Sequence, residues 1–493
     1  MDSVLDMIDL TKHEKQLANA VQRAKQNDII LPTFAQMKDP SKIPSKITKE
    51  LESIGLWDIV PRNLFRITWK NQPVEKGGKF GNVNYIELPP SLTGVEARII
   101  CLVGKWFPTG AHKVGAAYGC LAPRLVTGQF DPSFHKAVWP STGNYCRGGA
   151  FDGKLLACES IAILPEGMSK ERFQWLQTVA SEIIATPGTE SNVKEIYDKC
   201  HELEATRDNI MIFNQFAEHG NHLWHYEVTG NAIHEVLQKE MHGSDRFVGS
   251  TFTTGSAGTI GAGDLLKELY PISKVAAGEA LQCPTLLANG YGAHRIEGIG
   301  DKHVPWIHNI KNTDVVIAID DQDVVNNIRL FNEPAGKNYL INDVGVPDDL
   351  VQNLSLMGFS SIANVLMCIK MAKYYDLQSD DVLVTVWTDS MDLYQSRLAE
   401  LKAEHGEYTK IHAAVDYNRS LTGIKTDNME ELSYQAKKRI HHLKYYTWVE
   451  QQGKDVQELD RQWYDKNYWN NIHKLTPKID ELITSFNEKT GLI

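Results

Sequence analysis

Short apolar runs alternate with segments of helical length between about residues 95 and 400, and this alternation constrains the fold more than any other feature. The runs are residues 98–103, 137–139, 160–164, 182–185, 209–213, 247–252, 315–319 and 382–386. Segments such as 169–180, 192–203 and 257–269 lie between them. Strands that alternate with helices form βαβ units, in which helices cover both faces of a largely parallel sheet. The sequence therefore predicts an α/β fold.

The two flanks of this region have a different character. Residues 1–84 are mixed and polar, and we expect them to form an N-terminal extension that packs on the core. Residues 406–493 are rich in charged and aromatic side chains with helical spacing in places, which predicts a helical C-terminal extension. A lid or an oligomer contact is the alternative role for this second flank. The core itself is predicted to span residues 85–405.

The composition of the 493-residue chain is that of an ordinary globular protein, with 42% apolar and 23% charged residues. A net charge of −11 argues against a nucleic-acid partner, because surfaces that bind nucleic acid are basic. No apolar segment approaches the roughly 18 residues of a membrane span, and residues 1–6 lack the features of a secretory signal. The seven cysteines contain no Cys-x-x-Cys pair, so neither a disulfide framework nor a structural zinc site is expected. These features predict a cytoplasmic protein.

A lysine stands at one of the predicted strand-to-helix junctions. The strand 98–103 is followed by Pro108 and Gly110, which break the chain, and then by a helix-like segment from Ala111 onward. Lys113 would therefore lie at the edge of the sheet where ligands of α/β proteins bind. A lysine partly removed from water there can act as an amine nucleophile or form a Schiff base. A solvated lysine on a first helical turn is the alternative, and two further motifs decide against it.

Both further motifs are strand-to-helix turns of small and polar residues. Residues 141–149 (STGNYCRGG) follow the strand 137–139 and offer backbone amides and hydroxyls to a carboxylate. Residues 253–263 (TTGSAGTIGAG) follow the strand 247–252 and let backbone amides approach a phosphate closely. The absence of a following Gly-Lys-Ser/Thr disfavours a nucleoside triphosphate. A dinucleotide is the weaker ligand alternative, and an ordinary polar loop or tight turn is the structural one.

A lysine amine, a carboxylate turn and a phosphate cradle together suit pyridoxal 5′-phosphate. At these motifs the chain resembles the fold type II pyridoxal-phosphate enzymes, most closely the cysteine synthase (O-acetylserine sulfhydrylase) and cystathionine β-synthase group. The collinear segments that carry this resemblance over about residues 85–400 are 108–113, 141–144, 164–172, 214–216, 255–259, 294–300 and 386–394. The resemblance implies a tryptophan synthase β-like fold with two open parallel-sheet αβα subdomains, of which the smaller, mobile one spans about residues 125–230.

The resemblance also implies roles for individual residues. Lys113 is expected to carry the cofactor and to act as acid and base at the substrate Cα, and Asn144 to hydrogen-bond the cofactor O3′ atom. The residues expected to cradle the phosphate are Gly255, Ser256, Ala257, Gly258 and Thr259. Those expected at the substrate carboxylate are Ser141, Thr142, Tyr145 and Gln215. Ser390 is expected beside the pyridine nitrogen, where a neutral hydroxyl favours β-elimination chemistry over transamination.

Several positions depart from the family pattern. Tyr145 replaces the small residue that usually follows the loop asparagine, which predicts a reshaped substrate pocket. Trp106 and Phe107 stand where polar residues are more common. His112 matches the residue order of tryptophan synthase β chains, which implies a contact with the phosphate. Paired regulatory repeats and a Cys-Pro haem signature are missing, so a fully regulated cystathionine β-synthase is not expected.

The implied activity is that of an enzyme acting at Cβ of a small amino acid, such as cysteine, serine or an O-activated serine, through an aminoacrylate. β-Elimination by a lyase and β-replacement by a transferase use the same residues, so both stay open, with a slight preference for action on cysteine or a derivative. The alternatives are a tryptophan-synthase-like or dehydratase-type enzyme, and a non-catalytic cofactor-binding scaffold. The expected partners are an amino-acid substrate and a second copy of the chain in a homodimer.

Other residues with reactive side chains receive plainer interpretations. His219, His222 and His225 recur at three-residue spacing, but successive steps of three rotate around a helix, so the outer pair diverges. We expect packing or solvent roles for them and no metal site. Cys146 is expected to be a small buried cysteine.

Overall fold

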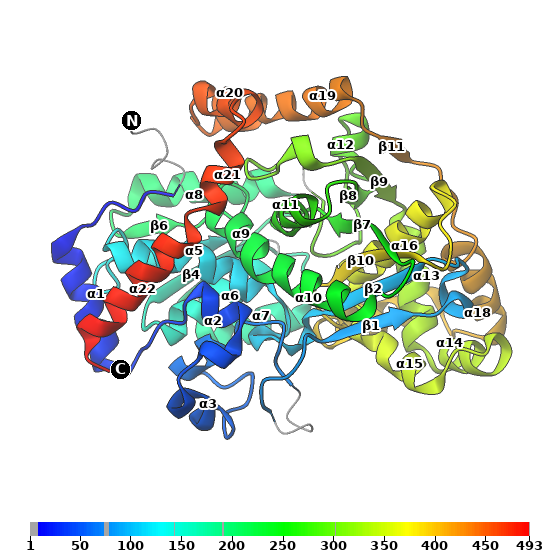
Figure 1. The fold of residues 1–493 in the computed structure, drawn as a ribbon, viewed down its shortest axis with the longest axis horizontal. Helices are drawn as coiled ribbons and strands as arrows, with labels where there is room; N and C mark the ends of the chain where they lie inside the picture. Colours follow the sequence, from blue (N-terminus) through cyan, green and yellow to red (C-terminus); the bar gives the residue numbers. More distant parts are fainter. Residues whose placement is uncertain (1–7, 73–77, 142, 190–191, 301, 493) are drawn as a thin grey trace.

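The protein is built on two sheets surrounded by helices, as seen in a computed structural model that describes residues 8–72, 78–141, 143–189, 192–300 and 302–492 (Figure 1). Within these residues the larger sheet has the strand order β1-β2-β10-β7-β8-β9-β11 and the smaller sheet β5-β4-β3-β6. The larger sheet comprises β1 (Tyr85–Leu88), β2 (Arg98–Val103), β7 (Arg246–Thr253), β8 (Lys274–Ala280), β9 (Val315–Ile319), β10 (Asp381–Trp387) and β11 (Met429–Glu431). The smaller sheet comprises β3 (Lys136–Pro140), β4 (Glu159–Pro165), β5 (Glu182–Thr186) and β6 (Ile210–Ile212). The predicted α/β fold is confirmed.

The strands are mostly parallel, as the βαβ pattern predicts. The inner strands β2, β10, β7, β8 and β9 run parallel, whereas the edge strands β1 and β11 pair antiparallel. All strands of the smaller sheet are parallel. Every residue of β9 and β10 is buried, as expected for strands covered on both faces. Because β10 inserts between β2 and β7, the carboxyl ends of these three strands lie side by side.

Helices cover the sheets and continue into both flanks of the core. The N-terminal segment, defined here as residues 8–84, contains α1 (Glu14–Gln26), α2 (Phe34–Lys38) and α3 (Ser45–Leu51). Residues 85–405 contain α4 (Pro90–Thr93), α5 (Lys113–Thr127), α6 (Asn144–Leu155), α7 (Lys170–Val179), α8 (Val193–Thr206), α9 (His219–Trp224), α10 (Gly230–Glu240), α11 (Ile260–Leu269), α12 (Thr285–Ala288), α13 (Asp321–Asn332), α14 (Pro334–Tyr339), α15 (Asp348–Asn353), α16 (Phe359–Tyr374) and α17 (Gln395–His405). The C-terminal segment, residues 406–492, contains α18 (Lys410–Asp416), α19 (Tyr434–Lys444), α20 (Val456–Tyr464), α21 (Tyr468–His473) and α22 (Thr476–Thr490). In the described ranges, none of these helices combines the length and the hydropathy needed to cross a membrane.

Glycines allow α5 to lie directly against α9. A Cβ atom at Gly119 of α5 would lie 2.5 Å from the carbonyl oxygen of Gly220, and one at Gly220 would lie 2.2 Å from the carbonyl oxygen of Gly119. A Cβ at Gly115 would lie 2.1 Å from the ring of Trp224. The two helix backbones are therefore in contact, which fixes the position of the helix that begins at Lys113.

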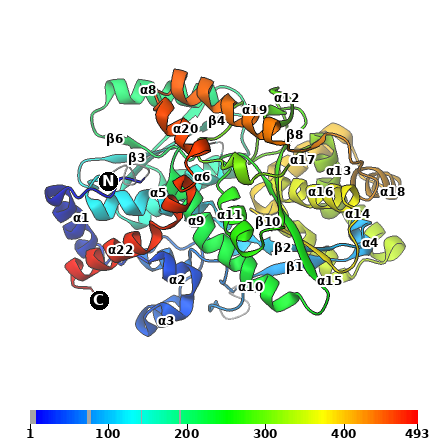
Figure 2. The same ribbon diagram turned by 45° about the horizontal axis from the view of Figure 1, so that its top comes forward.

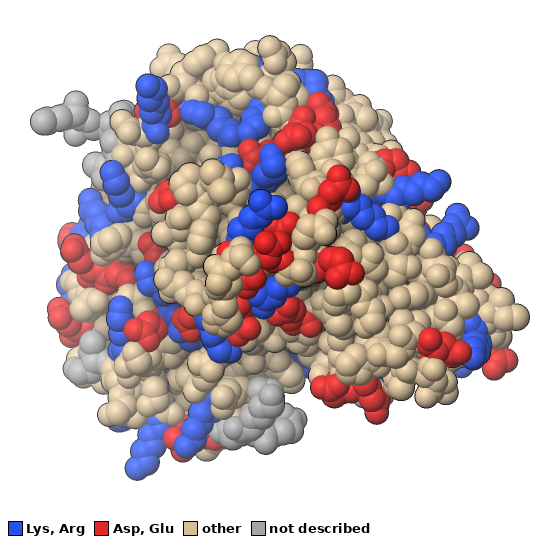
Figure 3. Space-filling view, turned by 45° about the vertical axis from the view of Figure 1, so that its right-hand side comes forward, with Lys and Arg blue, Asp and Glu red and all other residues tan. Residues whose placement is uncertain are grey.

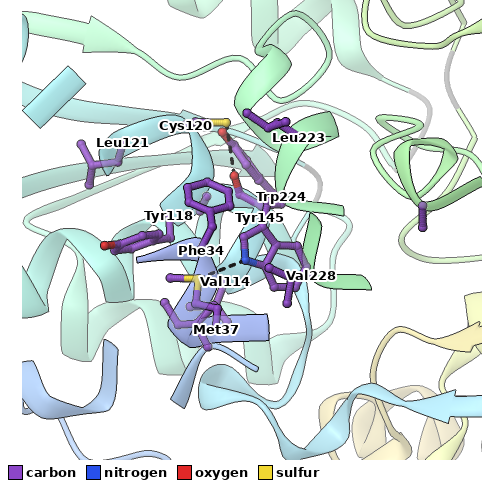
Figure 4. Packing of buried hydrophobic residues seen from close by; sticks show 14 of the residues in the cluster. Phe34, Met37, Val114, Tyr118, Cys120, Leu121, Tyr145, Leu223, Trp224 and Val228 are labelled. Carbon is purple, nitrogen blue, oxygen red and sulfur yellow. Dashed lines mark hydrogen bonds between the residues drawn. The ribbon is translucent and has the colours of Figure 1, made fainter. Parts of the chain in front are cut away.

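The N-terminal segment supports the same helix from another side (Figure 4). Phe34 and Met37 of α2 pack beside Val114 of α5 and Trp224 of α9 in one buried cluster. Trp224 Nε1 donates a hydrogen bond to Met37 Sδ at 3.4 Å. Because Val114 directly follows Lys113, this packing connects the N-terminal segment to the lysine.

The two ends of the chain also contact each other, since α22 lies beside α1 and α5 in both ribbon views (Figures 1 and 2). The side chain of Asn487 accepts from the Leu31 amide at 2.9 Å and donates to the Leu31 carbonyl at 2.8 Å. Asp480 accepts from the amides of Phe34 and Ala35 at 2.7 and 3.0 Å. The N-terminal segment is thus held between the core and α22, while the domain boundaries at residues 84 and 405 stay a prediction.

Charges of both signs are intermingled on the face shown in Figure 3, where Lys and Arg lie beside Asp and Glu. A nucleic-acid-binding surface would instead gather basic side chains on one face or along one helix. This face therefore shows no such surface.

Candidate active site

The amine of Lys113 lies where residues from both sheets meet. Lys113 is the first residue of α5 and follows the end of β2 by ten residues. Its Nζ donates to Ser256 Oγ at 2.9 Å and to Gln215 Oε1 at 3.3 Å. Ser256 follows β7 of the larger sheet, whereas Gln215 follows β6 of the smaller one. The lysine predicted to carry the cofactor therefore connects the two halves of the core.

The loop 255–259 connects β7 to α11 and presents its backbone to the lysine side. Ala257 adopts a left-handed conformation with φ 58°, and a Cβ at Gly258 would lie 2.1 Å from Asn221 Oδ1, so the loop is tightly held. Among the described residues, the amides of 255–259 donate no hydrogen bond to a backbone or side-chain acceptor. Because amides before a helix N-terminus bind anions, this loop can cradle a phosphate.

Asn221 of α9 supports this loop from behind and was not found by the sequence analysis. Its Nδ2 donates to the Gln215 carbonyl and to Ser256 Oγ, each at 3.0 Å. The Ser256 hydroxyl oxygen therefore receives hydrogen bonds from both Asn221 and Lys113. An asparagine between two histidines on a predicted helix gives no local signal of such a role.

The second turn follows β3 and leads into α6. Ser141 Oγ accepts from the Gly143 amide at 3.1 Å and from Gln215 Nε2 at 3.3 Å. Gln215 thus bridges Ser141 and the Lys113 amine. A Cβ at Gly143 would lie 2.4 Å from Arg172 Nη1, so this guanidinium lies directly against the loop. Thr142, which was predicted to bind the substrate carboxylate, lies outside the described residues.

These groups line one cavity that opens to solvent. The lining residues are His112, Lys113, Ser141, Asn144, Tyr145, Gln215, Phe216, Thr253, Gly255, Ser256, Ala257, Gly258, Thr259, Gly298, Ile299, Asn364, Val386 and Thr388. Polar groups that converge in one cavity are typical of a small-molecule site. The cavity therefore brings together the predicted lysine, carboxylate loop and phosphate cradle.

Two of the predicted residues lie differently from the rest. Tyr145 lines the cavity, but its hydroxyl is directed to Cys120 of α5 within the core (Figure 4). Ser390 is buried and is not among the described residues that line the cavity. Thr388 does line it, and its Oγ1 lies 3.3 Å from His112 Nε2. After β10 it is thus Thr388, and not Ser390, that places a hydroxyl among the described lining residues.

Of the aromatic pair before Pro108, Phe107 belongs to the core and Trp106 is partly buried against it. Phe107 is fully buried and packs edge-on against Trp69 and Trp224 at centroid distances of 5.0 and 6.0 Å. Neither Trp106 nor Phe107 is among the described lining residues of the cavity. The pair therefore does not shape the pocket in the described structure.

His112 presents a neutral imidazole to the cavity. Burial, together with the neighbouring Lys113 charge, lowers the pKa of His112 to about 3. Its ring also packs edge-on against His225, with centroids 4.9 Å apart. At neutral pH this histidine can hydrogen-bond a phosphate but adds no positive charge to it.

The histidines of α9 and the following turn are buried, so they pack inside the protein rather than facing solvent. His222 Nε2 lies 3.0 Å from His473 Nε2 of α21 and 3.4 Å from Asp264 Oδ2 of α11. The two imidazole planes are within 4° of parallel and their centroids are 5.3 Å apart, so the rings meet end to end. This is the geometry of an N–H···N hydrogen bond. The cluster ties the C-terminal segment to the two helices beside the cradle.

The cavity residues fit pyridoxal 5′-phosphate. The amides of 255–259 suit its phosphate and the Lys113 amine suits its aldehyde carbon. Asn144 Nδ2 carries two N–H groups and donates one of them to Asp389 Oδ2, so the second can donate to a ligand oxygen. The fold and the cavity together define a fold type II pyridoxal-phosphate site.

Comparison with known proteins agrees with this assignment. The family model for pyridoxal-phosphate dependent enzymes matches residues 88–336, which is half of the chain. The protein belongs to this family, and its cofactor is pyridoxal 5′-phosphate. The resemblance to fold type II enzymes stated from the sequence is confirmed.

Individual proteins similar to this chain include a probable cysteine synthase and a cystathionine beta-synthase. The chain is 29% identical to a probable cysteine synthase of Bacillus subtilis over 290 residues, which cover 59% of this chain and 85% of the relative. It is 25% identical to the cystathionine beta-synthase of Saccharomyces cerevisiae over 331 residues, or 65% of this chain and 62% of that one. A crystal structure of cysteine synthase from Entamoeba histolytica has a TM-score of 0.55 at 22% identity, covering 68% of this chain and 93% of its own. A hydrogen sulfide-producing enzyme from Fusobacterium nucleatum has a TM-score of 0.53 at 22% identity, covering 64% and 97%. The two structures show the shared fold.

Proposed function

We propose that the protein catalyses β-elimination or β-replacement at Cβ of a small amino acid such as cysteine, serine or an O-activated serine. The observation that carries this proposal is the Lys113 amine, held between Ser256 of the phosphate cradle and Gln215 beside the carboxylate loop. Similarity to a probable cysteine synthase and a cystathionine beta-synthase supports the substrate class.

The cofactor would be held by groups from both halves of the core. Backbone amides of 255–259 would bind its phosphate, and Lys113 would bind its aldehyde carbon covalently. When bound, pyridoxal phosphate supplies an electron sink for negative charge that develops at the substrate Cα. Asn144, on the opposite wall, would hydrogen-bond the ring oxygen.

Lys113 would then move the proton at Cα. Ser256 Oγ and Gln215 Oε1 both accept hydrogen bonds from its Nζ, so they would hold the free amine in place. An amine held in this way can take the Cα proton as a general base and return it as an acid.

The turn after β3 would orient the substrate. Ser141 and Gln215 offer hydrogen-bond donors beside the lysine, and the amides at the start of α6 favour a carboxylate. Arg172 lies directly against this turn at Gly143. A substrate carboxylate bound there would place the Cα proton toward the lysine and leave the Cβ substituent toward the rest of the cavity.

The same residues serve elimination and replacement, so the second substrate decides between them. The Trp106–Phe107 pair does not line the cavity and therefore no longer favours a bulky acceptor such as indole. The homodimer expected from the resemblance stays a prediction. Light scattering tests it, since a dimer has twice the chain mass of 55.5 kDa.

Covalent labelling tests the cofactor site first. The purified protein is incubated with pyridoxal phosphate and reduced with borohydride, and the modified peptide is identified by mass spectrometry. We expect the label on Lys113 and none on Lys113→Ala, while the exposed Lys154→Ala control keeps it. A protein that takes up no cofactor would support the scaffold alternative instead.

Product analysis then tests the reaction. L-cysteine, L-serine and O-acetyl-L-serine are supplied separately, with and without a thiol acceptor. Pyruvate and ammonia report elimination, and a new thioether amino acid reports replacement. We expect at least one of these products with wild type and none with Lys113→Ala, and turnover by that variant would contradict the role of the lysine.

A further inference from the structure

A buried carboxylate contacts the Asn144 amide from outside the cavity. Asn144 Nδ2 donates to Asp389 Oδ2 at 2.6 Å. The Tyr394 hydroxyl donates to the same oxygen, also at 2.6 Å. Asp389 is fully buried, and it is not among the described lining residues of the cavity. Asp389 therefore acts on the site through the side chains that donate hydrogen bonds to it.

The contact crosses between the two halves of the core. Asn144 begins α6, beside the smaller sheet, whereas Asp389 follows β10 in the centre of the larger sheet. Arg172 of α7 makes a parallel connection, because its Nη2 donates to the Tyr394 hydroxyl at 2.8 Å and its Nη1 lies 2.9 Å from Glu297 Oε2. These hydrogen bonds join the turn after β3 and helix α7 to the residues that follow β10.

Burial and the neighbouring groups act in opposite directions on the pKa of Asp389. Burial raises the pKa of Asp389, while hydrogen bonds from Tyr394 and Asn144 and the charge of Arg172 oppose that rise. Both neighbours donate to Oδ2, and an ionised carboxylate can only accept. Short charge-assisted bonds of this kind are about twice as strong as neutral ones.

An acceptor at this place selects one orientation of the Asn144 amide. The amide has a donor end and an acceptor end of nearly equal size, and rotation by half a turn exchanges them. With Asp389 present, Nδ2 directs one N–H at the carboxylate and keeps its second N–H for the cavity, and the flipped orientation would bring two acceptor oxygens together. Asp389, which lies outside the cavity, therefore determines which atoms of the Asn144 amide face the cavity.

We propose that Asp389 is a positioning residue that acts through Asn144, holding the amide in the one orientation that can bind the pyridoxal phosphate ring oxygen. The proposal rests on the proposed function, in which Asn144 makes that bond. Asp389 does not touch the cofactor. Its removal weakens cofactor binding because the amide becomes free to turn, and each productive contact then requires the amide to be ordered again.

The test is a double-mutant cycle on cofactor affinity, measured by titrating the apoprotein with pyridoxal phosphate and following protein fluorescence. The variants are Asp389→Ala, Asn144→Ala and the double variant. We expect each single variant to raise the Kd by about tenfold or more, since a hydrogen bond involving a charged group is at stake. The double variant should be no weaker than Asn144→Ala, because residues that act through one contact are not additive.

A purely structural role gives different results. It predicts that the effects of Asp389→Ala and Asn144→Ala multiply in the double variant, and that result would overturn the proposal. A second readout is the circular dichroism of the bound cofactor, which reports its surroundings rather than protein stability. The spectra of Asp389→Ala and Asn144→Ala should match each other and differ from wild type. A wild-type spectrum in Asp389→Ala would also overturn it.

Three further variants separate folding from positioning. Asp389→Asn keeps the side-chain volume but can donate as well as accept, so it no longer selects one orientation of the amide and should raise the Kd nearly as much as Asp389→Ala. Tyr394→Phe removes only the second donor to Asp389 and should leave the Kd within about threefold of wild type, which corresponds to less than 1 kcal/mol. Asp392→Asn, at an exposed carboxylate in the same turn, is the matched control and should leave the Kd unchanged. Covalent labelling of wild type at Lys113 tests the cofactor site independently of Asp389. If wild type is labelled but Asp389→Ala binds the cofactor as tightly as wild type, only the role of Asp389 is wrong.

Discussion

The contact between Asn487 and Leu31 offers a sharp test of how the two ends of the chain support the active site. Asn487 of α22 is buried and makes two hydrogen bonds to the backbone of Leu31, one through each end of its amide. Leucine has nearly the shape of asparagine but neither donor nor acceptor. The substitution Asn487→Leu therefore removes both bonds while keeping the side-chain volume.

The size of the effect follows from the groups left behind. Leu31 is fully buried, so its amide and carbonyl would lose their hydrogen bonds to Asn487 without gaining water. A buried polar group without a partner costs about 1–3 kcal/mol, and two such groups less the gain from burying leucine give about 2–5 kcal/mol. The N-terminal segment should consequently open more often, and α2 with its packing on Val114 should open with it.

Hydrogen–deuterium exchange measures this opening. Because 1.4 kcal/mol corresponds to a factor of ten, amides of residues 29–38 should exchange at least about 30-fold faster in Asn487→Leu than in wild type. The exposed Asn470→Leu in α21 is the control and should leave these amides unchanged. Unchanged exchange at 29–38 in Asn487→Leu would refute the view that α22 holds the N-terminal segment.

Three other predictions concern the cradle, a buried carboxyl and the strand end. Gly258→Ala places a methyl group 2.1 Å from Asn221 Oδ1 and should weaken pyridoxal phosphate binding by about tenfold or more in a fluorescence titration; wild-type affinity would contradict the tight cradle. Burial raises the pKa of Asp480 from 3.8 to about 6, so between these values the folded state holds a proton that the unfolded chain has released. Wild type should therefore lose stability relative to Asp480→Asn as the pH rises from 4 to 6 in urea unfolding, and a constant difference would argue against it. Thr388→Val should weaken cofactor binding more than Ser390→Ala, since Thr388 lines the cavity; the opposite order would support the role predicted for Ser390.

Local sequence was sufficient wherever one short stretch carries both the structure and the chemistry. The apolar runs predicted the parallel strands, because strands buried on both faces need continuous apolar sequence. Lys113 and the loop 255–259 were found for a related reason. Each follows a buried strand at the same edge of the sheet, so the chain pattern alone brings their residue types toward one site.

Residues that act through distant partners gave no such signal. Asn221 supports the cradle from α9, and its partner Ser256 is 35 residues away. Asp389 meets Asn144 across 245 residues. The three-residue spacing of the histidines did not indicate that His222 would meet His473 of the C-terminal segment.

The sequence by itself determined the α/β class, the family and the loops proposed to hold the cofactor, because strand periodicity, turn residues and a lysine at a strand end are local properties. Only the tertiary structure decided which side chains stand behind those loops and how the two flanks of the chain support them. Insertion of β10 between β2 and β7 brings Asp389 to Asn144, and docking of α22 holds the N-terminal segment against the helix of Lys113. These contacts depend on the order of strands and on the packing of helices from opposite ends of the chain, which no single stretch of sequence contains.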